Sequence, residues 1–515
     1  MARPSRVVTF KDFTGGLNLS RQKQDLALNE TPDCLDVDFD KRGGFIQRNG
    51  IKNLTTDANM NGGYLLGAYS FGTDLLYGIS ATGRLWTWDG STATHVATAL
   101  TDQFTVLVKS ALWTAKVYFA NAFSAGSLVM KYYTGSAWTT LTNTANNNYS
   151  APTGGNAPLS RLIADHAGYM WWGDTTESAT RYRSRIRFSH YLQPEDFAAA
   201  DYFDIDPDDQ TDQITALVPF NNMLVVFKKK SVWGVYGTSR TEFVVERLSA
   251  AAGVWTQESV ATAPDRLYWW SPDGDLYTFD GRSVERIGQR LRQLVDDGLL
   301  TAGADHRLCW AEGKLYMSLV LAAGTRETYM FNPEVGAEGC WTKYSFKYTS
   351  MVWWRRLSGL NGIMMTVASK DGIYDFNVTG QERDYDGTTT TSIAAYYCTA
   401  WFAAEDPALK KRFLRMHVTA ACKDAATLNI GVYYNYNEST IQRTLTTPLA
   451  AALGGMAWGD VWGGSWGGVD PVYSFDRLTT SGRAHAIRYK FYVTDHLSKW
   501  WVDSFALPYR EKGYR

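Results

Sequence analysis

The stretch that decides the fold runs from Ile214 to Gly288, where ITALVPFNNMLVVFKKKSVWGVYG is followed, from Arg266, by RLYWWSPDGDLYTFDGRSVERIG. In the second half, strand-forming residues up to Ser271 lead into the turn PDG, and the returning strand ends at Asp280-Gly281. Asp-Gly pairs supply the positive φ angles that tight hairpin turns require. Each half of the stretch therefore predicts two short strands around a turn.

This turn-plus-strand unit recurs along the chain. Gly83–Gly90 (GRLWTWDG) closely matches Gly274–Gly281 (GDLYTFDG), and Asp371–Phe376 is a third clear copy. With weaker copies near Gly126, Ser184, Ser231 and Arg326, the copies lie about 43 to 58 residues apart. That spacing is typical of four-stranded propeller blades, which bury their faces by radial stacking. We expect an all-β protein with a β-propeller of about six or seven blades; an array of β-sandwiches is the competing architecture.

The composition supports a β-rich chain and limits its chemistry. Among 515 residues there are 20 Trp, 30 Tyr, 23 Phe and 45 Gly, which favour strands and turns. A net charge of −1 argues against the broad basic surface of a duplex-DNA binder. No apolar run reaches the roughly 18 residues of a membrane span, and residues 1–12 lack the apolar core of a secretory signal, so we expect folding in a cytoplasm.

The cysteines and histidines predict neither a metal site nor a disulfide framework. No C-x-x-C pair, H-x-x-x-H or H-E-x-x-H spacing occurs, and neither does a Walker loop or a Rossmann fingerprint, so we expect no metal and no cofactor. Buried, reduced thiols are the preferred interpretation of the five cysteines, which are Cys34, Cys309, Cys340, Cys398 and Cys422.

The chain divides into four segments. Residues 1–50 predict an N-terminal arm and a hairpin from about Cys34 to Arg48, which we expect to close the propeller ring; a simple strand of the main domain is the alternative to an arm. Residues 51–378 form the propeller, and the polar residues 379–392 (TGQERDYDGTTTTS) form a linker. Residues 393–515 contain alternating strands, and they predict a C-terminal antiparallel β-sandwich.

An arginine-rich strand is a candidate channel or interface element. Because strand side chains alternate between faces, the arginines of RYRSRIRF all point to one side; they are Arg181, Arg183, Arg185 and Arg187. Four guanidinium groups on one face need anions opposite them. The candidates are, in order, the nearby acidic stretch, an acidic patch of another subunit and a phosphate backbone.

The acidic stretch is the second candidate element. Pro194–Asp212 contains eight acidic residues and no basic one, including Asp204, Asp206, Asp208 and Asp209. Its spacing lacks the Gly and Glu of a calcium-binding loop, so a solvated acidic loop is preferred over a cation site. In a channel it would repel DNA phosphate.

A Trp/Gly segment supplies the candidate partner-contact loop, with Trp458, Trp462 and Trp466. Gly463–Gly467 formally matches G-x-S-x-G, but the nucleophile elbow needs a strand before the Ser and a helix after it, whereas Asp470-Pro471 follows almost at once. We therefore expect a loop that covers a neighbouring surface, and no catalytic residues.

Several of these segments resemble one protein family. FTGGLNL, PDCLDVDFDKRGGFIQRNG, DQITALVPFNNMLVVFKKKSVWGVYG and LYWWSPDGDLYTFDGRSVERIG, together with WGGSWGG at Trp462–Gly468, resemble the propeller-containing tail proteins of tailed bacteriophages. The resemblance is greatest to the nozzle or tail-tubular proteins of short-tailed phages.

The resemblance implies a structural virion protein of the tail, assembled in the bacterial host cytoplasm. Such proteins form a homo-oligomeric ring, commonly a hexamer, around the DNA exit channel, and they join the portal and adaptor region to the distal tail and its fibres. The family has no catalytic residues to carry over. A receptor- or glycan-binding tail module, using the Trp458–Trp466 loop, is the alternative, followed by a cell-wall glycosidase with two carboxylates across a cleft.

Overall fold

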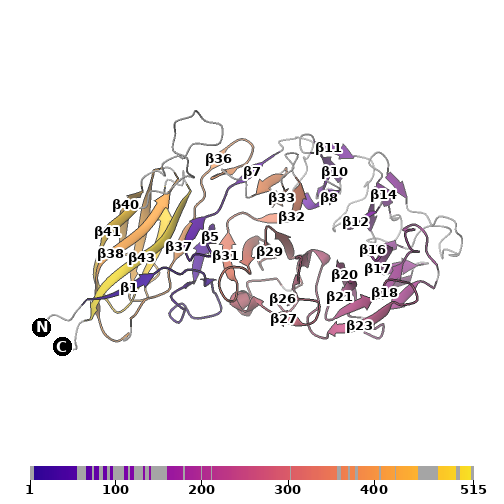
Figure 1. Ribbon diagram of the computed structural model, residues 1–515, viewed down its shortest axis with the longest axis horizontal. Coiled ribbons are helices and arrows are strands. Elements are labelled where there is room, and N and C mark those ends of the chain that lie inside the picture. Colours follow the sequence, from indigo (N-terminus) through magenta and orange to yellow (C-terminus); the bar gives the residue numbers. More distant parts are fainter. Residues whose placement is uncertain are drawn as a thin grey trace.

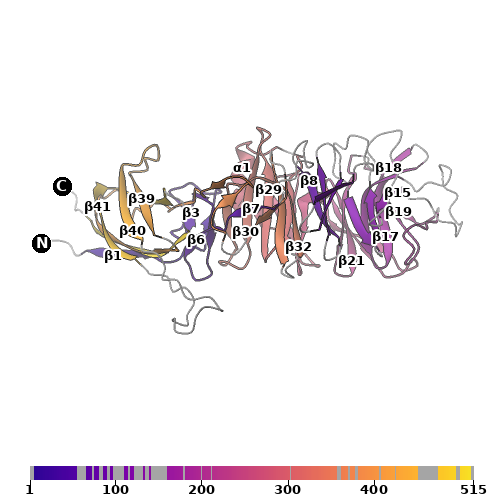
Figure 2. The same ribbon diagram turned by 90° about the horizontal axis from the view of Figure 1, so that it is seen from above.

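The computed structural model describes residues 5–511 except 55–64, 72–74, 81–84, 90–92, 97–108, 114–115, 121–130, 134–137, 141–158, 178–179, 199, 210, 302, 356–360, 369–371, 377–380, 405–406, 424, 450–473 and 495–498. Two β-rich bodies lie side by side, a ring of sheets and a smaller sandwich that contains both chain ends (Figure 1). Figure 2 shows the same two bodies from above, in one elongated molecule.

The larger body is a β-propeller of seven antiparallel blades (Figure 1). Blades 1 and 2 consist of β8 (Leu65–Phe71), β9 (Leu75–Ser80), β10 (Leu85–Trp88) and β11 (Ala93–Val96), and of β12 (Lys109–Trp113), β13 (Lys116–Ala120), β14 (Lys131–Tyr133) and β15 (Trp138–Thr140). Blades 3 and 4 consist of β16 (Leu159–His166), β17 (Tyr169–Glu177), β18 (Thr180–Phe188) and β19 (Tyr202–Asp204), and of β20 (Ile214–Phe220), β21 (Met223–Lys228), β22 (Val232–Tyr236) and β23 (Val244–Ser249).

The remaining blades complete the ring. Blades 5 and 6 consist of β24 (Val260–Thr262), β25 (Leu267–Trp270), β26 (Leu276–Phe279) and β27 (Val284–Arg286), and of β28 (Arg307–Ala311), β29 (Lys314–Val320), β30 (Arg326–Asn332) and β31 (Cys340–Tyr344). Blade 7 contains β32 (Tyr348–Arg355), β33 (Asn361–Val367) and β34 (Tyr374–Phe376). Helix is confined to η2 (Gln257–Ser259), η3 (Gly288–Leu291) and α1 (Arg292–Asp296) in the part of the chain that the structure describes.

The sequence repeat marks the third strand of every blade. The seven copies fall on or shortly before β10, β14, β18, β22, β26, β30 and β34. Gly274 and Gly281 have φ angles of 82° and 96°, which is the left-handed backbone that their turns require. The propeller prediction is confirmed, with seven blades, and the stretch from Ile214 to Gly288 spans blades 4 and 5.

Ring closure differs from the sequence prediction. The fourth strand of blade 7 is β7 (Ile51–Asn53), whose Asn53 lies opposite Tyr374 of β34. The expected hairpin does form, from β5 (Val37–Phe39) and β6 (Phe45–Gln47), but β6 pairs with β43 (Trp500–Glu511) of the sandwich. Its two phenylalanines are buried in the sandwich core, so the hairpin cannot serve as the outer edge of a blade.

The smaller body packs two sheets against each other. One has the strand order β41-β38-β43-β6-β5, with β1 (Arg6–Phe10) also paired to β43; its other members are β38 (Lys411–Cys422) and β41 (Ser474–Ala484). The second has the order β4-β37-β42-β39-β40, formed by β4 (Asp33–Leu35), β37 (Tyr396–Cys398), β42 (Ile487–Val493), β39 (Ala426–Tyr434) and β40 (Arg443–Leu449).

The N-terminal segment is therefore a structural part of the sandwich, and the prediction of an arm is wrong. Four of its strands pair with strands from the C-terminal segment or with one another inside the two sheets. The short parallel pair of β2 (Gly16–Leu17) and β3 (Glu30–Thr31) lies between them. The expected linker also differs, because β35 (Asp384–Tyr385) and β36 (Thr390–Thr391) extend blade 7 beyond β7.

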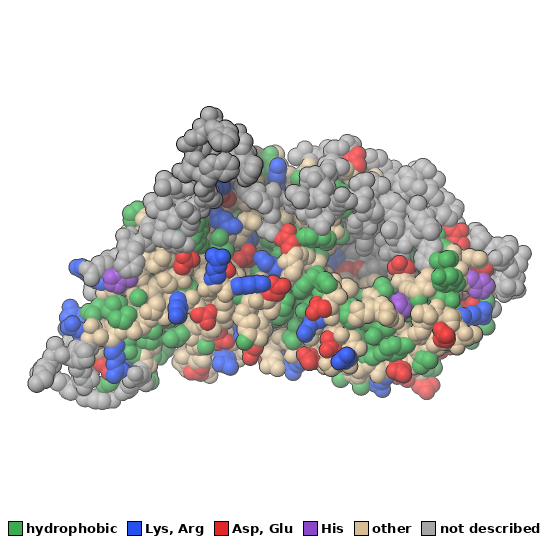
Figure 3. All heavy atoms as spheres, in the orientation of Figure 1, with side chains coloured by type: hydrophobic (Ala, Val, Ile, Leu, Met, Phe, Trp, Pro, Cys, Tyr) green, Lys and Arg blue, Asp and Glu red, His purple; other side chains and the backbone are tan. Residues whose placement is uncertain are grey.

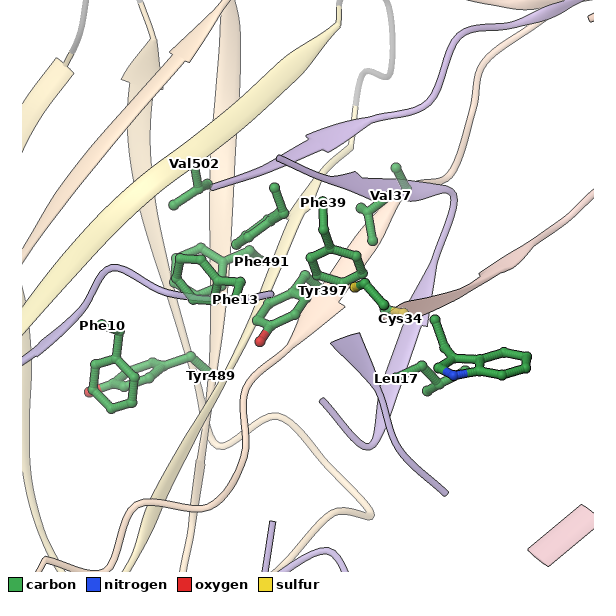
Figure 4. Close-up of a cluster of buried hydrophobic side chains, with 14 of the residues drawn as sticks. Phe10, Phe13, Leu17, Cys34, Val37, Phe39, Tyr397, Tyr489, Phe491 and Val502 are labelled. Carbon is green, nitrogen blue, oxygen red and sulfur yellow. The ribbon is translucent and has the colours of Figure 1, made fainter. Parts of the chain in front are cut away.

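One hydrophobic core crosses the boundary between the two bodies. It contains Phe10 and Phe13 from the N-terminal segment, Tyr397 and Phe505 from the sandwich, and Trp341 from blade 6. The close-up in Figure 4 shows the N-terminal side chains between the two sandwich sheets and the neighbouring blade. The rings of Phe13 and Tyr397 meet edge to face at 5.4 Å. Burial of such rings is the dominant stabilising term in folding, so the bodies are held together as one core.

A buried ion network fixes the same boundary. Arg48 is fully buried; its Nε donates to Asp36 Oδ1 at 2.6 Å, and its Nη1 and Nη2 donate to the two oxygens of Asp384 at 2.9 and 2.8 Å. Burial opposes its charge, but Asp36 and Asp384 raise the pKa of Arg48 above its ordinary value. The network joins the segment before β7 to the segment that leaves the propeller.

Two further sequence predictions can be compared with the structure. All five cysteines are free and buried, as expected. Within the described ranges, no helix is long and apolar enough to cross a membrane.

Candidate functional site

The arginine-rich strand is β18, the third strand of blade 3. Arg185 and Arg187 are buried, whereas Arg181 and Arg183 are exposed. Arg187 forms a two-bond pair with Glu177 at 2.6 and 2.7 Å, and Arg185 Nη1 approaches Glu177 at 3.4 Å. Both arginines therefore lie on one face of the strand, as the alternation predicts.

Arg185 is enclosed by aromatic rings and carboxylates. Its Nε and Nη2 each donate to Asp204 at 2.8 Å. Its guanidinium carbon lies 3.8 Å from the ring centroid of Tyr182 and 3.9 Å from that of Tyr202. Bidentate pairing and cation–π stacking satisfy this side chain inside the blade. Burial opposes the charge of Glu177, but its bonds from Arg187 lower the pKa of that carboxyl. Arg185 and Arg187 are thus structural, and they are not available to a phosphate backbone.

The acidic stretch divides into structural and exposed carboxylates. Asp204 pairs with Arg185, as the first-ranked prediction has it, and the Asp206 carbonyl accepts from the buried Lys228 Nζ at 3.0 Å. Asp208 and Asp209 lie at the surface, where hydrogen bonds from Thr211 lower the pKa of Asp209 to about 2. No group of three metal-ligating side chains occurs among the residues with described positions.

A cluster of cations lies where blades 3 and 4 meet. Asp174, which is fully buried at the register shift between β17 and β18, accepts from Arg181 Nε at 2.7 Å and from Arg161 Nη1 at 3.3 Å. Arg183 is exposed on the same strand as Arg181, and its charge acts on both Arg161 and Lys229. Lys229 lies at the tip of the hairpin between β21 and β22. Burial, followed by repulsion from the guanidinium groups of Arg161, Arg183 and Arg181, lowers the pKa of Lys229. These four cations therefore share one patch of surface.

Trp255 completes the patch. Its indole ring lies under the Lys229 ammonium, with 4.3 Å from Nζ to the ring centroid, and remains 38% exposed. We call Arg161, Arg181, Arg183, Lys229 and Trp255 the cationic face. Figure 3 shows acidic and basic side chains intermingled over the visible face of the molecule.

Backbone packing holds the loop that carries Trp255. Val254 N–H donates to the Lys228 carbonyl at 2.9 Å, and Thr215 Oγ1 donates to the Val254 carbonyl at 2.7 Å. A Cβ on Gly253 would lie 2.3 Å from the carbonyl carbon and oxygen of Lys229, so this contact requires glycine. The loop is fixed against the blade 4 hairpin before any ligand arrives.

A small pocket opens beside Trp255. It is lined by Trp255, Trp270, Val295, Leu300, Thr301 and His306, among others. His306 Nε2 faces the Thr301 carbonyl at 3.2 Å, and its Nδ1 accepts from Val320 N–H at 3.1 Å. Burial lowers the pKa of His306 to about 4, so the imidazole is neutral near pH 7. The pocket wall is therefore mainly apolar and uncharged.

The sequence analysis found only part of this face. It named Arg181 and Arg183 but missed Arg161, Asp174 and Trp255. The only available signals were the lysine run and an aromatic residue soon after Gly253. The predicted contact residues Trp458, Trp462 and Trp466 lie outside the described residues.

Comparisons with known proteins show similarity in structure alone. No protein-family model matches the chain, and no curated protein matches it. Solved propellers do resemble it.

One is BamB from Moraxella catarrhalis, with 13% identity, a TM-score of 0.35, and coverage of 70% of this chain and 96% of that one. The WD40 propeller domain of Doa1 has 9% identity, a TM-score of 0.38, and coverage of 64% and 97%. YCF48 from Cyanidioschyzon merolae has 9% identity, a TM-score of 0.37, and coverage of 64% and 99%. The assignment of the fold rests on the seven blades themselves, which are six four-stranded sheets and the larger sheet of blade 7.

Proposed function

We propose that the chain is a structural virion protein that forms the nozzle ring of a phage tail. In this role several copies, most simply six, surround the DNA exit channel and join the portal and adaptor region to the distal tail and fibres. The ring has no catalytic task, and it assembles in the cytoplasm of the bacterial host.

The observation that supports this role is the position of the segments that resemble the phage family. FTGGLNL contributes Phe13 and Leu17 to the core shared by the two bodies. PDCLDVDFDKRGGFIQRNG contributes β4, β5, β6 and the buried Arg48. Two of the resembling segments thus supply residues that fix the sandwich on the propeller. A protein that carries load between neighbours in a particle needs such a rigid joint.

The packing between the bodies supports a load-transmitting role. A Cβ on Gly16 would lie 2.4 Å from Cys340 Sγ and 2.7 Å from the Trp341 carbonyl oxygen, so β2 touches blade 6 at backbone distance. Interior packing of this density is stiff and transmits strain. A subunit packed in this way keeps its two bodies in a fixed relative orientation under mechanical load.

The test is the state of assembly. Purified full-length chain is examined by light scattering and by electron microscopy over a range of concentrations, and particles produced from the encoding genome are examined for the chain by mass spectrometry. We expect closed rings, and the chain in the tail of the particle. A strictly monomeric chain that is also absent from particles would refute the proposal.

Experiments with the same particles distinguish the ring function from a receptor-binding function. A channel wall is expected neither to compete with particles for adsorption to cells nor to bind glycans on an array. Competition for adsorption by the isolated chain would favour the receptor-binding function instead.

A further inference from the structure

We propose that the cationic face binds a short acidic peptide segment of a partner protein, with carboxylates on Arg183 and Lys229 and a neighbouring apolar side chain in the pocket beside Trp255. This inference is independent of the ring role, because it rests on the surface of blades 3 to 6 alone.

The cationic face carries more positive than negative charge. Four cations gather here, and the carboxylates that face them are Asp174 and Asp212. Both carboxylates are buried and already bonded, Asp174 to Arg181 and Arg161, and Asp212 to the Lys230 N–H and the Ser231 hydroxyl. Among the residues with described positions, neither Arg183 nor Lys229 has a carboxylate within ion-pair distance. The face therefore has two cations to offer to an external anion.

The cations and the pocket share Trp255 as a common wall. Trp255 lies under the Lys229 ammonium and also lines the pocket, so the cations and the apolar cavity form one continuous surface. Gly303 packs on the indole, since a Cβ there would lie 3.0 Å from the ring. Trp255 therefore contacts both Lys229 and Gly303. A rigid aromatic side chain beside fixed charges is the usual composition of a binding hot spot.

The acidic loop beside the cationic face limits which class of anion can bind. The exposed carboxylates of Asp208 and Asp209 lie in the loop that leads into blade 4, next to the lysine hairpin, and Lys230 Nζ reaches Asp209 at 3.5 Å. A long polyanion that crossed this surface would meet those carboxylates. A short acidic segment avoids them, and it can place an aliphatic side chain against Val295 and Leu300. An acidic peptide thus fits better than a nucleic acid strand.

The test uses full-length chain and labelled peptides in fluorescence anisotropy. The probe is a fluorescein-labelled peptide DEELED, compared with NQQLQN, which lacks the charges, and DEESED, which lacks the apolar side chain. We expect DEELED to bind, NQQLQN to bind on the order of tenfold or more weakly, and DEESED to bind with an intermediate affinity. Rising salt should weaken DEELED binding.

Variants of the chain locate the site. The double variant Arg183→Glu with Lys229→Glu should lose DEELED binding, and Trp255→Ala should weaken it several-fold, while Trp255→Phe retains most of it. The matched control is Arg412→Glu, which reverses an exposed arginine on β38 of the sandwich and should leave binding unchanged. Circular dichroism verifies that each variant is folded.

Three results would overturn the proposal. One is the absence of DEELED binding at millimolar concentration, and another is equal affinity for DEELED and NQQLQN. The third is a labelled oligothymidylate that binds as tightly as DEELED and is lost in the same double variant, which would assign the face to nucleic acid. Because the peptide comparison uses unmodified chain, misfolding of a variant leaves the test intact.

Discussion

The guanidinium group of Arg48 and the carboxylate of Asp384 form a two-bond ion pair that joins the segment before the first propeller strand to the segment after the last. The two residues are far apart in sequence, and Arg48 has no exposed surface. The same arginine also bonds Asp36, so one cation neutralises two carboxylates inside the protein. Removing it would leave both of them without their partner.

Replacing Arg48 with Met should therefore destabilise the protein by about 3–5 kcal/mol, because breaking a buried pair leaves uncompensated buried charge. Chemical unfolding followed by circular dichroism measures the change. Arg412→Met, at an exposed position, should change the free energy of unfolding by less than about 0.5 kcal/mol. Similar midpoints for the two variants would contradict the assigned role of Arg48.

A pair of glycine variants tests the contact between the bodies. Gly16 and Gly298 have nearly equal φ angles, 61° and 64°, but a Cβ on Gly16 meets Cys340 and Trp341, while one on Gly298 has nothing within 4 Å. Gly298→Ala should lower the free energy of unfolding by only about 1 kcal/mol, which is the strain of a left-handed alanine. Gly16→Ala should cost at least about 2 kcal/mol more, since backbone must move. Equal melting temperatures for the two variants would show that the joint can yield.

Deleting residues 1–54 should prevent formation of a native state. The deletion removes β7, the closing strand of blade 7, and the strands that complete both sandwich sheets. We expect loss of cooperative unfolding and strong binding of a hydrophobic dye, because the shared core is opened. A deletion of residues 1–5, which precede β1, is the control and should unfold cooperatively. Cooperative unfolding of the longer deletion would contradict the proposed closure.

The stability of the propeller should depend on His306 in mildly acidic solution. Burial lowers the pKa of this imidazole from 6.5 to about 4, so between these values the unfolded chain binds a proton that the folded chain does not. Stability from this group is complete above pH 6.5 and falls as the pH drops towards 4, by at most ~3 kcal/mol. His306→Gln should flatten the dependence of the unfolding free energy on pH in that window. Parallel curves for the variant and the unmodified chain would contradict the assignment.

The repeat could be predicted from the sequence because the third strand of each blade follows a tight turn, and the residues that a tight turn requires are set by its own backbone angles. Gly274 and Gly281 need positive φ angles, and this requirement is visible in a single residue type. Closure was not readable, because β7 is only three residues long (IKN) and its partner Tyr374 lies some 320 residues away. Local patterns cannot specify which distant edge a short strand joins.

The candidate site follows the same rule. Alternation placed Arg185 and Arg187 on one face, because strand geometry is local. The register shift that brings Asp174 to Arg181, and the loop that brings Trp255 under Lys229, depend on contacts between strands or blades, so no window of sequence contains them.

The pairing of β1 with β43 makes the propeller an insertion within the sandwich. During synthesis, the strands made first must wait for the strands made last, while seven blades form between them. Blade-by-blade folding is local and can proceed early, whereas the sandwich has the long sequence separations that slow folding. The sandwich thus forms last and holds the two ends of the chain together. A chain that is interrupted after the propeller would keep its first strands unpaired and prone to aggregation.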